Sequence, residues 1–270
     1  MKNLLMIFLI LLAFPAQADN AVFNRVINGG TLRCGYIVWQ PYMMKDPNTG
    51  KLSGMSYDIF EALGKTLGLK IDWVSEVQSG QEAEALNSDK VDAVCSTVPS
   101  NSRSAKYMDY IDGYAYMPFY IYMKKGGKMV NNVADLNTAQ MSVTGMDGDI
   151  SLFAAEQYFP TAKKVAVPSS ADPTSINLNV QMGKADFVVN DPASLAYFNA
   201  ANGDQLIPIL ATKPLVTLKE GAAIKKGENN LRQTLNEGME LMLTSGLIDQ
   251  ILDKWDESQK LMKRRAMPWR

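Results

Sequence analysis

The sequence predicts an α/β fold that is built as two lobes. Short apolar runs alternate with amphipathic stretches along the chain, a pattern typical of helices packed on largely parallel sheets. The alternation occurs in two successive halves. Two extended stretches without a helical period, residues 114–124 and 215–225, flank the second half and are candidates for crossovers between the lobes.

The first half opens with a short helix that ends at Gly29-Gly30, and a strand at 32–38 follows it. Residues 46–50, Asp-Pro-Asn-Thr-Gly, have the composition of a turn. The apolar pattern then predicts, in chain order, a helix from residue 56 to Gly68, a strand at 69–74, a helix at 82–87 and a strand at 91–95.

The second half repeats this order of elements. A strand at 141–143 runs into a loop rich in glycine and aspartate at 145–149. Two amphipathic helices, at 229–243 and 247–255, close the chain after the second extended stretch. The remaining elements are a helix at 151–158, a strand at 164–167, a helix at 175–182, a strand at 185–189 and a helix at 192–200.

This order predicts a lobe that is interrupted by the other. We expect lobe 1 to comprise residues 19–113 and 218–258, and lobe 2 to comprise residues 114–217 as an insertion. Two connections between lobes make a hinge, and a cleft between hinged lobes is the usual place for a small-molecule site.

Residues 1–18 have the features of a secretory signal peptide. Lys2 supplies a positive charge, residues 4–14 form an apolar run, and Ala16-Gln17-Ala18 is a small-x-small cleavage site. The run is shorter than the roughly 20 apolar residues that a membrane-spanning helix needs. An uncleaved N-terminal anchor is the alternative. We expect cleavage after Ala18 and export of the mature chain to the periplasm.

Charge and composition argue against several functions. The formal net charge of −1 provides no field for binding nucleic acid. The chain has no histidine, so Ser-His and Cys-His nucleophiles and the commonest zinc ligand are absent. We expect no cofactor and no metal. Basic residues gather in a C-terminal tail at 259–270, which is either a solvated end or a contact with a membrane face or a partner.

The two cysteines, Cys34 and Cys95, each fall in a predicted buried strand. An exported chain meets an oxidising compartment, where disulfides persist. Two packed free thiols are the alternative, because the sequence does not supply the Cα separation of roughly 4.4–6.8 Å that a bridge requires. Both states remain open at this point.

Several short segments follow one family pattern in order. They are Gly-Thr-Leu-Arg-Cys-Gly-Tyr at 30–36, Pro-Tyr at 41–42, Leu-Ser-Gly-Met-Ser-Tyr-Asp-Ile at 52–59, Val-Asp-Ala-Val at 91–94, Gly-Lys-Ala-Asp-Phe-Val-Val-Asn-Asp at 183–191, Ala-Ile-Lys-Lys-Gly at 223–227 and residues 245–255. Together they resemble the family 3 extracellular solute-binding proteins, the receptors of polar amino acid ABC transporters. The ordered set covers nearly the whole mature chain.

The resemblance implies a type II periplasmic-binding-protein fold, in which each lobe is a mostly parallel sheet flanked by helices. It implies that Trp39, two residues before Pro41, covers a ligand from lobe 1. A tryptophan packed in the core is the alternative. It also implies that Asp191 receives the ammonium group of a substrate. Asp191-Pro192 is in addition an excellent start for a helix, so capping alone is the alternative.

The residues that would bind the α-carboxylate of an amino acid match the family pattern less closely in this chain. The resemblance implies hydroxyl groups at the end of the 91–95 strand, and Ser96 and Thr97 supply them. It also implies an arginine, and Arg103 lies one residue earlier than the family pattern has it. Arg103 therefore reaches the cleft through a shorter loop or is a solvated surface residue.

The second lobe departs further from the family. Met146-Asp147-Gly148-Asp149 stands where the family has Gly-Thr-Thr at a helix start. A free helix N-terminus attracts anions, but here Asp147 or Asp149 would already occupy it. Asp147, Asp149 and Asp191 together suit an amine-bearing ligand, although capping by the first two is the plain alternative.

We therefore predict a monomeric binding protein without catalysis. It would capture a small polar, amine-bearing molecule, an amino acid or a related compound, and deliver it to an ABC transporter permease in the inner membrane. One alternative is an enzyme on the same scaffold, similar to cyclohexadienyl dehydratase, which needs a carboxylic acid with a raised pKa. Another is a ligand-sensing partner of a membrane receptor.

Overall fold

The computed structural model describes residues 20–256 and 261–266. The signal peptide predicted at residues 1–18 lies outside the described residues, as do parts of the basic C-terminal segment. Among the helices that are described, none is long and apolar enough to cross a membrane.

Lobe 1 is built around three parallel strands. β1 (Thr31–Tyr36) lies between β4 (Lys70–Glu76) and β5 (Ala93–Pro99) and pairs with both. α2 (Met55–Leu67) buries an apolar face that includes Ile59 and Phe60 against this sheet. The other elements are α1 (Ala21–Gly29), β2 (Met44–Lys45), β3 (Leu52–Ser53), α3 (Glu82–Asn87), the 3-10 helix η1 (Ser104–Lys106), β6 (Met108–Tyr110), α7 (Asn229–Thr244) and α8 (Leu247–Trp255).

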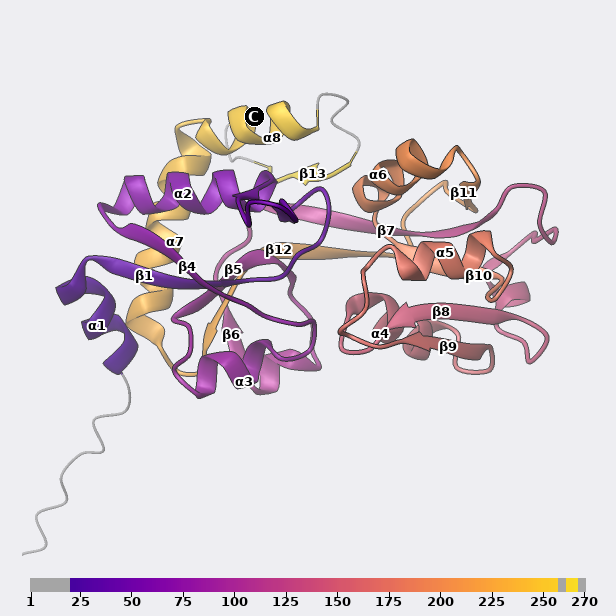
Figure 1. The fold of residues 1–270 in the computed structure, drawn as a ribbon, viewed down its shortest axis with the longest axis horizontal. Helices are drawn as coiled ribbons and strands as arrows, with labels where there is room; N and C mark the ends of the chain where they lie inside the picture. Colours follow the sequence, from indigo (N-terminus) through magenta and orange to yellow (C-terminus); the bar gives the residue numbers. More distant parts are fainter. Residues whose placement is uncertain (1–19, 257–260, 267–270) are drawn as a thin grey trace, which may run out of the picture.

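Lobe 2 repeats the arrangement on a smaller scale (Figure 1). β8 (Ser142–Met146) lies between β9 (Lys163–Val167) and β10 (Phe187–Asn190), and both pairings are parallel. The other elements are the 3-10 helix η2 (Val133–Leu136), α4 (Ile150–Tyr158), α5 (Ser175–Gln181), α6 (Pro192–Asn202) and β11 (Leu206–Ile209).

Two long antiparallel strands, β7 (Ala115–Lys124) and β12 (Val216–Lys225), run between the lobes (Figure 1). In lobe 1, β12 continues beside β5, and in lobe 2, β7 continues beside β10 and β11. One sheet therefore passes through both lobes. The structure confirms the predicted α/β fold of two lobes joined by two segments. The first predicted lobe limit, at residues 113–114, lies directly before β7. The second, at residues 217–218, lies within β12.

The largest apolar cluster also extends through both lobes. It contains Leu32 and Ile59 of lobe 1 together with Val143 and Phe187 of lobe 2. Alternate residues of β7, such as Met117, connect the two parts, because side chains two apart on a strand share one face. The lobes are thus packed on a common core near the hinge.

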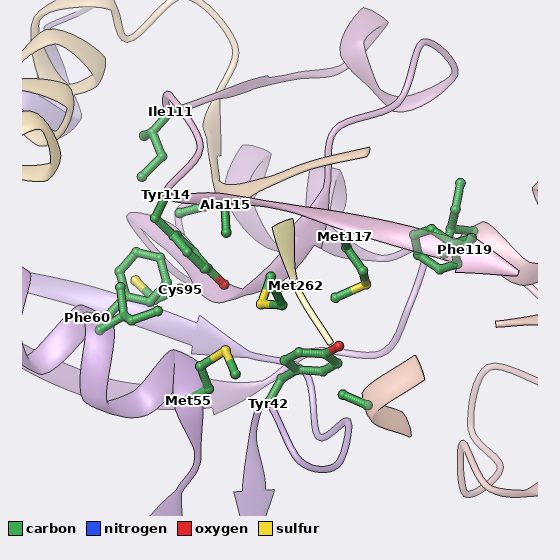
Figure 2. Packing of buried hydrophobic residues seen from close by; sticks show 14 of the residues in the cluster. Tyr42, Met55, Phe60, Cys95, Ile111, Tyr114, Ala115, Met117, Phe119 and Met262 are labelled. Carbon is green, nitrogen blue, oxygen red and sulfur yellow. The ribbon is translucent and has the colours of Figure 1, made fainter. Parts of the chain in front are cut away.

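Residues 261–266 of the basic segment fold back onto the hinge. β13 (Lys263–Arg264) pairs with Ala115 and Tyr116 of β7. Met262 is only 1% exposed, and Figure 2 shows it among the buried side chains beside Tyr42. This part of the chain is therefore not the solvated end that its composition suggested.

The charges of the same segment are largely neutralised within the protein. Arg264 pairs with Asp249 and Asp253 of α8, and Arg265 pairs with Glu240 of α7. These contacts hold two of the basic side chains against the helices of lobe 1.

Cys34 and Cys95 lie on the adjacent parallel strands β1 and β5. Both are fully buried, their Cα atoms are 5.4 Å apart, and the structure joins them in a disulfide. Figure 2 shows Cys95 beside Phe60 of α2. The bridge therefore lies inside the lobe 1 core.

Candidate functional site

A cavity lies between the two lobes beside the hinge strand β7. Its walls come from segments that follow β1, β5, β8 and β10, which are parallel strands. Ligands of open α/β sheets bind beyond the carboxyl ends of such strands. The polar side chains of the lining belong to Trp39, Tyr42, Ser79, Glu82, Thr97, Asn101, Ser104, Asp149 and Asp191.

Asp191 is placed in the cavity by the start of α6. The residue directly follows β10 and caps the helix: its Oδ1 accepts from the backbone N–H groups of Ala193 and Ser194, both at 2.9 Å. The same oxygen accepts from the Tyr42 hydroxyl of lobe 1 at 2.6 Å. Asp191 is therefore both a helix cap and a cavity residue.

Burial raises the pKa of the Asp191 carboxyl above its ordinary value. The hydrogen bonds from Tyr42, Ser194 and Ala193 favour the ionised form and oppose this shift. A positively charged ligand group would act in the same direction as these bonds, because it too stabilises the carboxylate.

Trp39 lies at the lobe boundary and contacts lobe 2. Its indole Nε1 donates to the Ser194 Oγ at 2.7 Å, and that hydroxyl donates to the backbone oxygen of Gln40 at 3.2 Å. The ring is half-buried and lines the cavity. The role of Trp39 as a cover over a ligand stays a prediction, and its hydrogen bond to Ser194 ties the lobes together.

The two hydroxyl residues at the end of β5 point in different directions. Thr97 lines the cavity, and its Oγ1 lies 2.6 Å from the Ser56 Oγ and 3.2 Å from the Tyr114 hydroxyl. Ser96 is buried and donates to the backbone oxygen of Ile37 at 3.0 Å. Ser96 is not among the residues that line the cavity, because successive side chains of a strand face opposite sides.

Arg103 does not reach the cavity. It pairs with Glu156 of α4 at 2.6 Å, its guanidinium lies 4.9 Å from the centre of the Phe153 ring, and its side chain is 57% exposed. It lines a second hollow that adjoins the cavity and shares lining residues such as Glu82 and Asp149 with it. In this structure the arginine joins the lobes, and its contact with a ligand carboxylate stays a prediction.

Asp147 also stands outside the cavity. It is exposed, and its backbone N–H donates to the oxygen of Val167. The chain turns at Gly148, whose φ of 78° is left-handed, so the next aspartate faces inward instead. Asp149 accepts from the Ser151 N–H at 2.7 Å and caps α4. Burial raises the pKa of its carboxyl.

Sequence reasoning missed five further polar residues of the lining, namely Tyr42, Ser79, Glu82, Asn101 and Ser104. Tyr42 occupies the second position of the Pro-Tyr segment, and its hydroxyl reaches Asp191 across the lobes. Glu82 begins α3, is 8% exposed, and has a pKa raised by burial. The Pro-Tyr motif was the available signal for Tyr42. Glu82 gave no such signal, because an acidic residue at a helix start usually stabilises the helix by interacting with its dipole.

The two hinged lobes and the cavity between them define a solute receptor that closes on its ligand. Residues 32–258 match the model of the bacterial extracellular solute-binding proteins, family 3. The chain belongs to this family, as its ordered motifs predicted.

Three relatives illustrate the breadth of the family. The chain is 25% identical to the L-cystine-binding protein TcyA of Bacillus subtilis, with 80% of this chain and 77% of TcyA covered. It is 26% identical to an L-arginine-binding protein of Pseudomonas aeruginosa, with 80% and 84% covered. The crystal structure of the ancestral amino acid-binding protein AncCDT-1, a precursor of cyclohexadienyl dehydratase, is 27% identical and superposes with a TM-score of 0.74, covering 86% of this chain and 98% of that one.

Proposed function

We propose that the protein captures a small amine-bearing solute between its lobes in the periplasm and delivers it to an ABC transporter permease in the inner membrane. The observation that carries the proposal is the Asp191 carboxylate, which is buried in the inter-lobe cavity and bonded to both lobes. Charge-assisted hydrogen bonds from an ammonium group are stronger than neutral ones. Asp191 thus provides a strong anchor for an amine.

The names of the relatives support binding as the activity. TcyA and the Pseudomonas protein are named for binding L-cystine and L-arginine, both amine-bearing molecules. In this chain, ligand capture would exclude water from the cavity and shift the balance of open and closed forms by the preference of the ligand for the closed form. The closed form would then dock on the permease.

The test is isothermal titration calorimetry of the mature chain against amino acids, amines and organic acids. We expect amine-bearing ligands to bind, and Asp191→Asn to weaken them at least about tenfold, because hydrogen bonds to charged groups contribute about 1.5–3 kcal/mol. Asparagine is also a good helix cap, so the variant keeps the start of α6. Asp204→Asn, an exposed residue of lobe 2, is the matched control.

Two results would contradict the proposal. Binding only by organic acids that lack an amine would show that the cavity does not select positive charge. Unchanged amine affinity in Asp191→Asn would reduce Asp191 to a helix cap.

A further inference from the structure

Glu220 is a buried acid that the family motifs do not mark. It lies in the hinge strand β12, and its exposure is 0%. Neither carboxylate oxygen has a hydrogen-bond partner among the described residues. A buried carboxylate is costly unless a charge or hydrogen bond offsets it. The position therefore calls for a partner that the described residues do not supply.

The register of the sheet directs Glu220 toward the cavity. Glu220 pairs with Pro99 of β5 on one side and with Ala115 of β7 on the other. Paired residues of antiparallel strands share a face, and so do residues two apart on one strand. Pro99 and Met117 line the cavity. Glu220 accordingly stands on the same sheet face as Pro99 and Met117, next to the cavity, although it is not itself among the residues that line it.

Two further carboxyl groups, those of Asp191 and Asp149, lie close enough to Glu220 to interact with it electrostatically. Burial raises the pKa of Glu220 well above its ordinary value, and the charges of Asp191 and Asp149 raise it further. Asp191 and Asp149 each receive backbone N–H bonds at a helix start, which compensate part of their charge. Glu220 has no such compensation.

The described lining offers nothing positive for a ligand carboxylate. It contains no lysine or arginine side chain. Arg103 is held by Glu156 at the edge of the lobes. The start of α4, where a free helix N-terminus would attract an anion, is occupied by Asp149. A carboxylate entering this cavity would meet like charge.

The rest of the lining is apolar. Ile37, Met108, Met117, Phe119 and Ile150 contribute side chains from both lobes and the hinge. Such a surface favours methylene groups, because burial of apolar area contributes about 25 cal/mol per Å². An aliphatic chain with charged ends matches this combination of walls and carboxylates.

We propose that the cavity takes an aliphatic diamine without a carboxylate, with one ammonium group at Asp191 and the second at Glu220. The inference rests on the proposed function, since it concerns the same cavity. It names Glu220 as a specificity-determining residue and the α-carboxylate as the group that the cavity rejects.

Matched ligand pairs test the carboxylate and the second amine separately. Calorimetry of the mature chain near neutral pH compares 1,5-diaminopentane with lysine, which adds only a carboxylate, and with pentylamine, which lacks the second amine. We expect the diamine to bind at least about tenfold more tightly than either, as the loss of one charged hydrogen bond implies. Lysine binding as tightly as the diamine would overturn the inference and leave the proposed function standing. If none of the three binds, the diamine inference fails, and the wider panel of amino acids, amines and organic acids decides the proposed function.

The variant Glu220→Gln tests the residue itself. We expect it to weaken the diamine at least about tenfold and to leave pentylamine within about twofold, because only the diamine has a second charge to lose. Glu237→Gln, an exposed residue of α7, removes the same charge far from the cavity and should change neither affinity. Circular dichroism and the melting temperature establish that both variants are folded. A folded Glu220→Gln protein with unchanged diamine affinity would contradict the assignment.

Discussion

At the scale of single residues, two kinds of carboxyl group lie in the cavity or next to it. Asp149 and Asp191 cap the starts of helices, where backbone N–H groups donate hydrogen bonds to their carboxylates and stabilise the negative charge. Glu220 lies in the middle of a strand, where the backbone N–H groups serve the sheet. Position within the secondary structure thus decides which acid is satisfied by the protein and which is left for a ligand.

This difference gives the ligand-free protein an unusual dependence on pH. Burial raises the pKa of Glu220, Asp191 and Asp149. The folded state therefore keeps protons that the unfolded state has already released, and stability falls as the pH rises toward the folded-state pKa values. We expect the free energy of unfolding to decline over the range from the ordinary carboxyl pKa of about 4 up to the raised folded-state values, by up to about 1.4 kcal/mol per pH unit for each proton retained.

Urea unfolding across that range measures the effect. Glu220→Gln should show a shallower decline than the unmodified chain, because one of the retained protons is gone. A stability that rises with pH over the same interval would mean that these carboxyl groups are ionised in the folded protein.

The sequence allowed some site residues to be placed and not others. Asp191 and Thr97 follow apolar strands, and polar residues at the ends of parallel strands gather at one edge of a sheet. Arg103 and Asp147 lie in loops, where a shift of one residue decides which way a side chain points. Glu220 falls in an extended stretch, and its burial depends on two neighbouring strands that are distant in sequence.

At the scale of elements, periodicity identified the long helices and the parallel strands of both lobes. It missed β2, β3, β6, β11 and β13, which have only two to four residues each and show too little of a period. β13 forms only because β7 offers a free edge at Ala115 and Tyr116. Such pairing is a property of the assembled sheet and has no local signal.

The disulfide is the strongest single tie between elements. It joins β1 to β5 and closes a loop with a sequence separation of 61 residues. Replacing Cys34 and Cys95 by alanine should lower the free energy of unfolding by about 2–4 kcal/mol, since the bridge restricts the unfolded chain. Urea unfolding of the variant and of the oxidised protein measures the difference. Equal stabilities would show that the bridge contributes nothing to the folded lobe.

At the scale of the whole molecule, the lobes meet closely at two glycines. A Cβ atom placed on Gly148 of lobe 2 would lie 2.6 Å from the Cα of Gly80 in lobe 1. Backbone can approach backbone here only because both residues lack a side chain. Closure of the cavity therefore depends on this contact as well as on Tyr42 and Trp39.

Gly148→Ala should hold the lobes apart and weaken ligand binding at least about tenfold, because an atom would intrude between two backbones. The control is Gly183→Ala. Gly183 has a similar left-handed φ of 73°, but its added Cβ would meet nothing within 4 Å. Both variants carry the same backbone strain, of about 1–2 kcal/mol, so only the first should lose affinity in calorimetry. Equal affinities in the two variants would contradict a role of the contact in closure.

The sheet and the apolar cluster that pass through both lobes have a consequence for unfolding. Domains that own separate cores can melt one after the other, each with its own midpoint. In this protein Leu32 and Phe187, from opposite lobes, belong to one cluster, and β7 contributes to the pairing in both. The lobes can bend about the hinge, and each has a smaller apolar cluster of its own, but they share the largest cluster. Heat should therefore melt the receptor as one cooperative unit, in a single two-state transition.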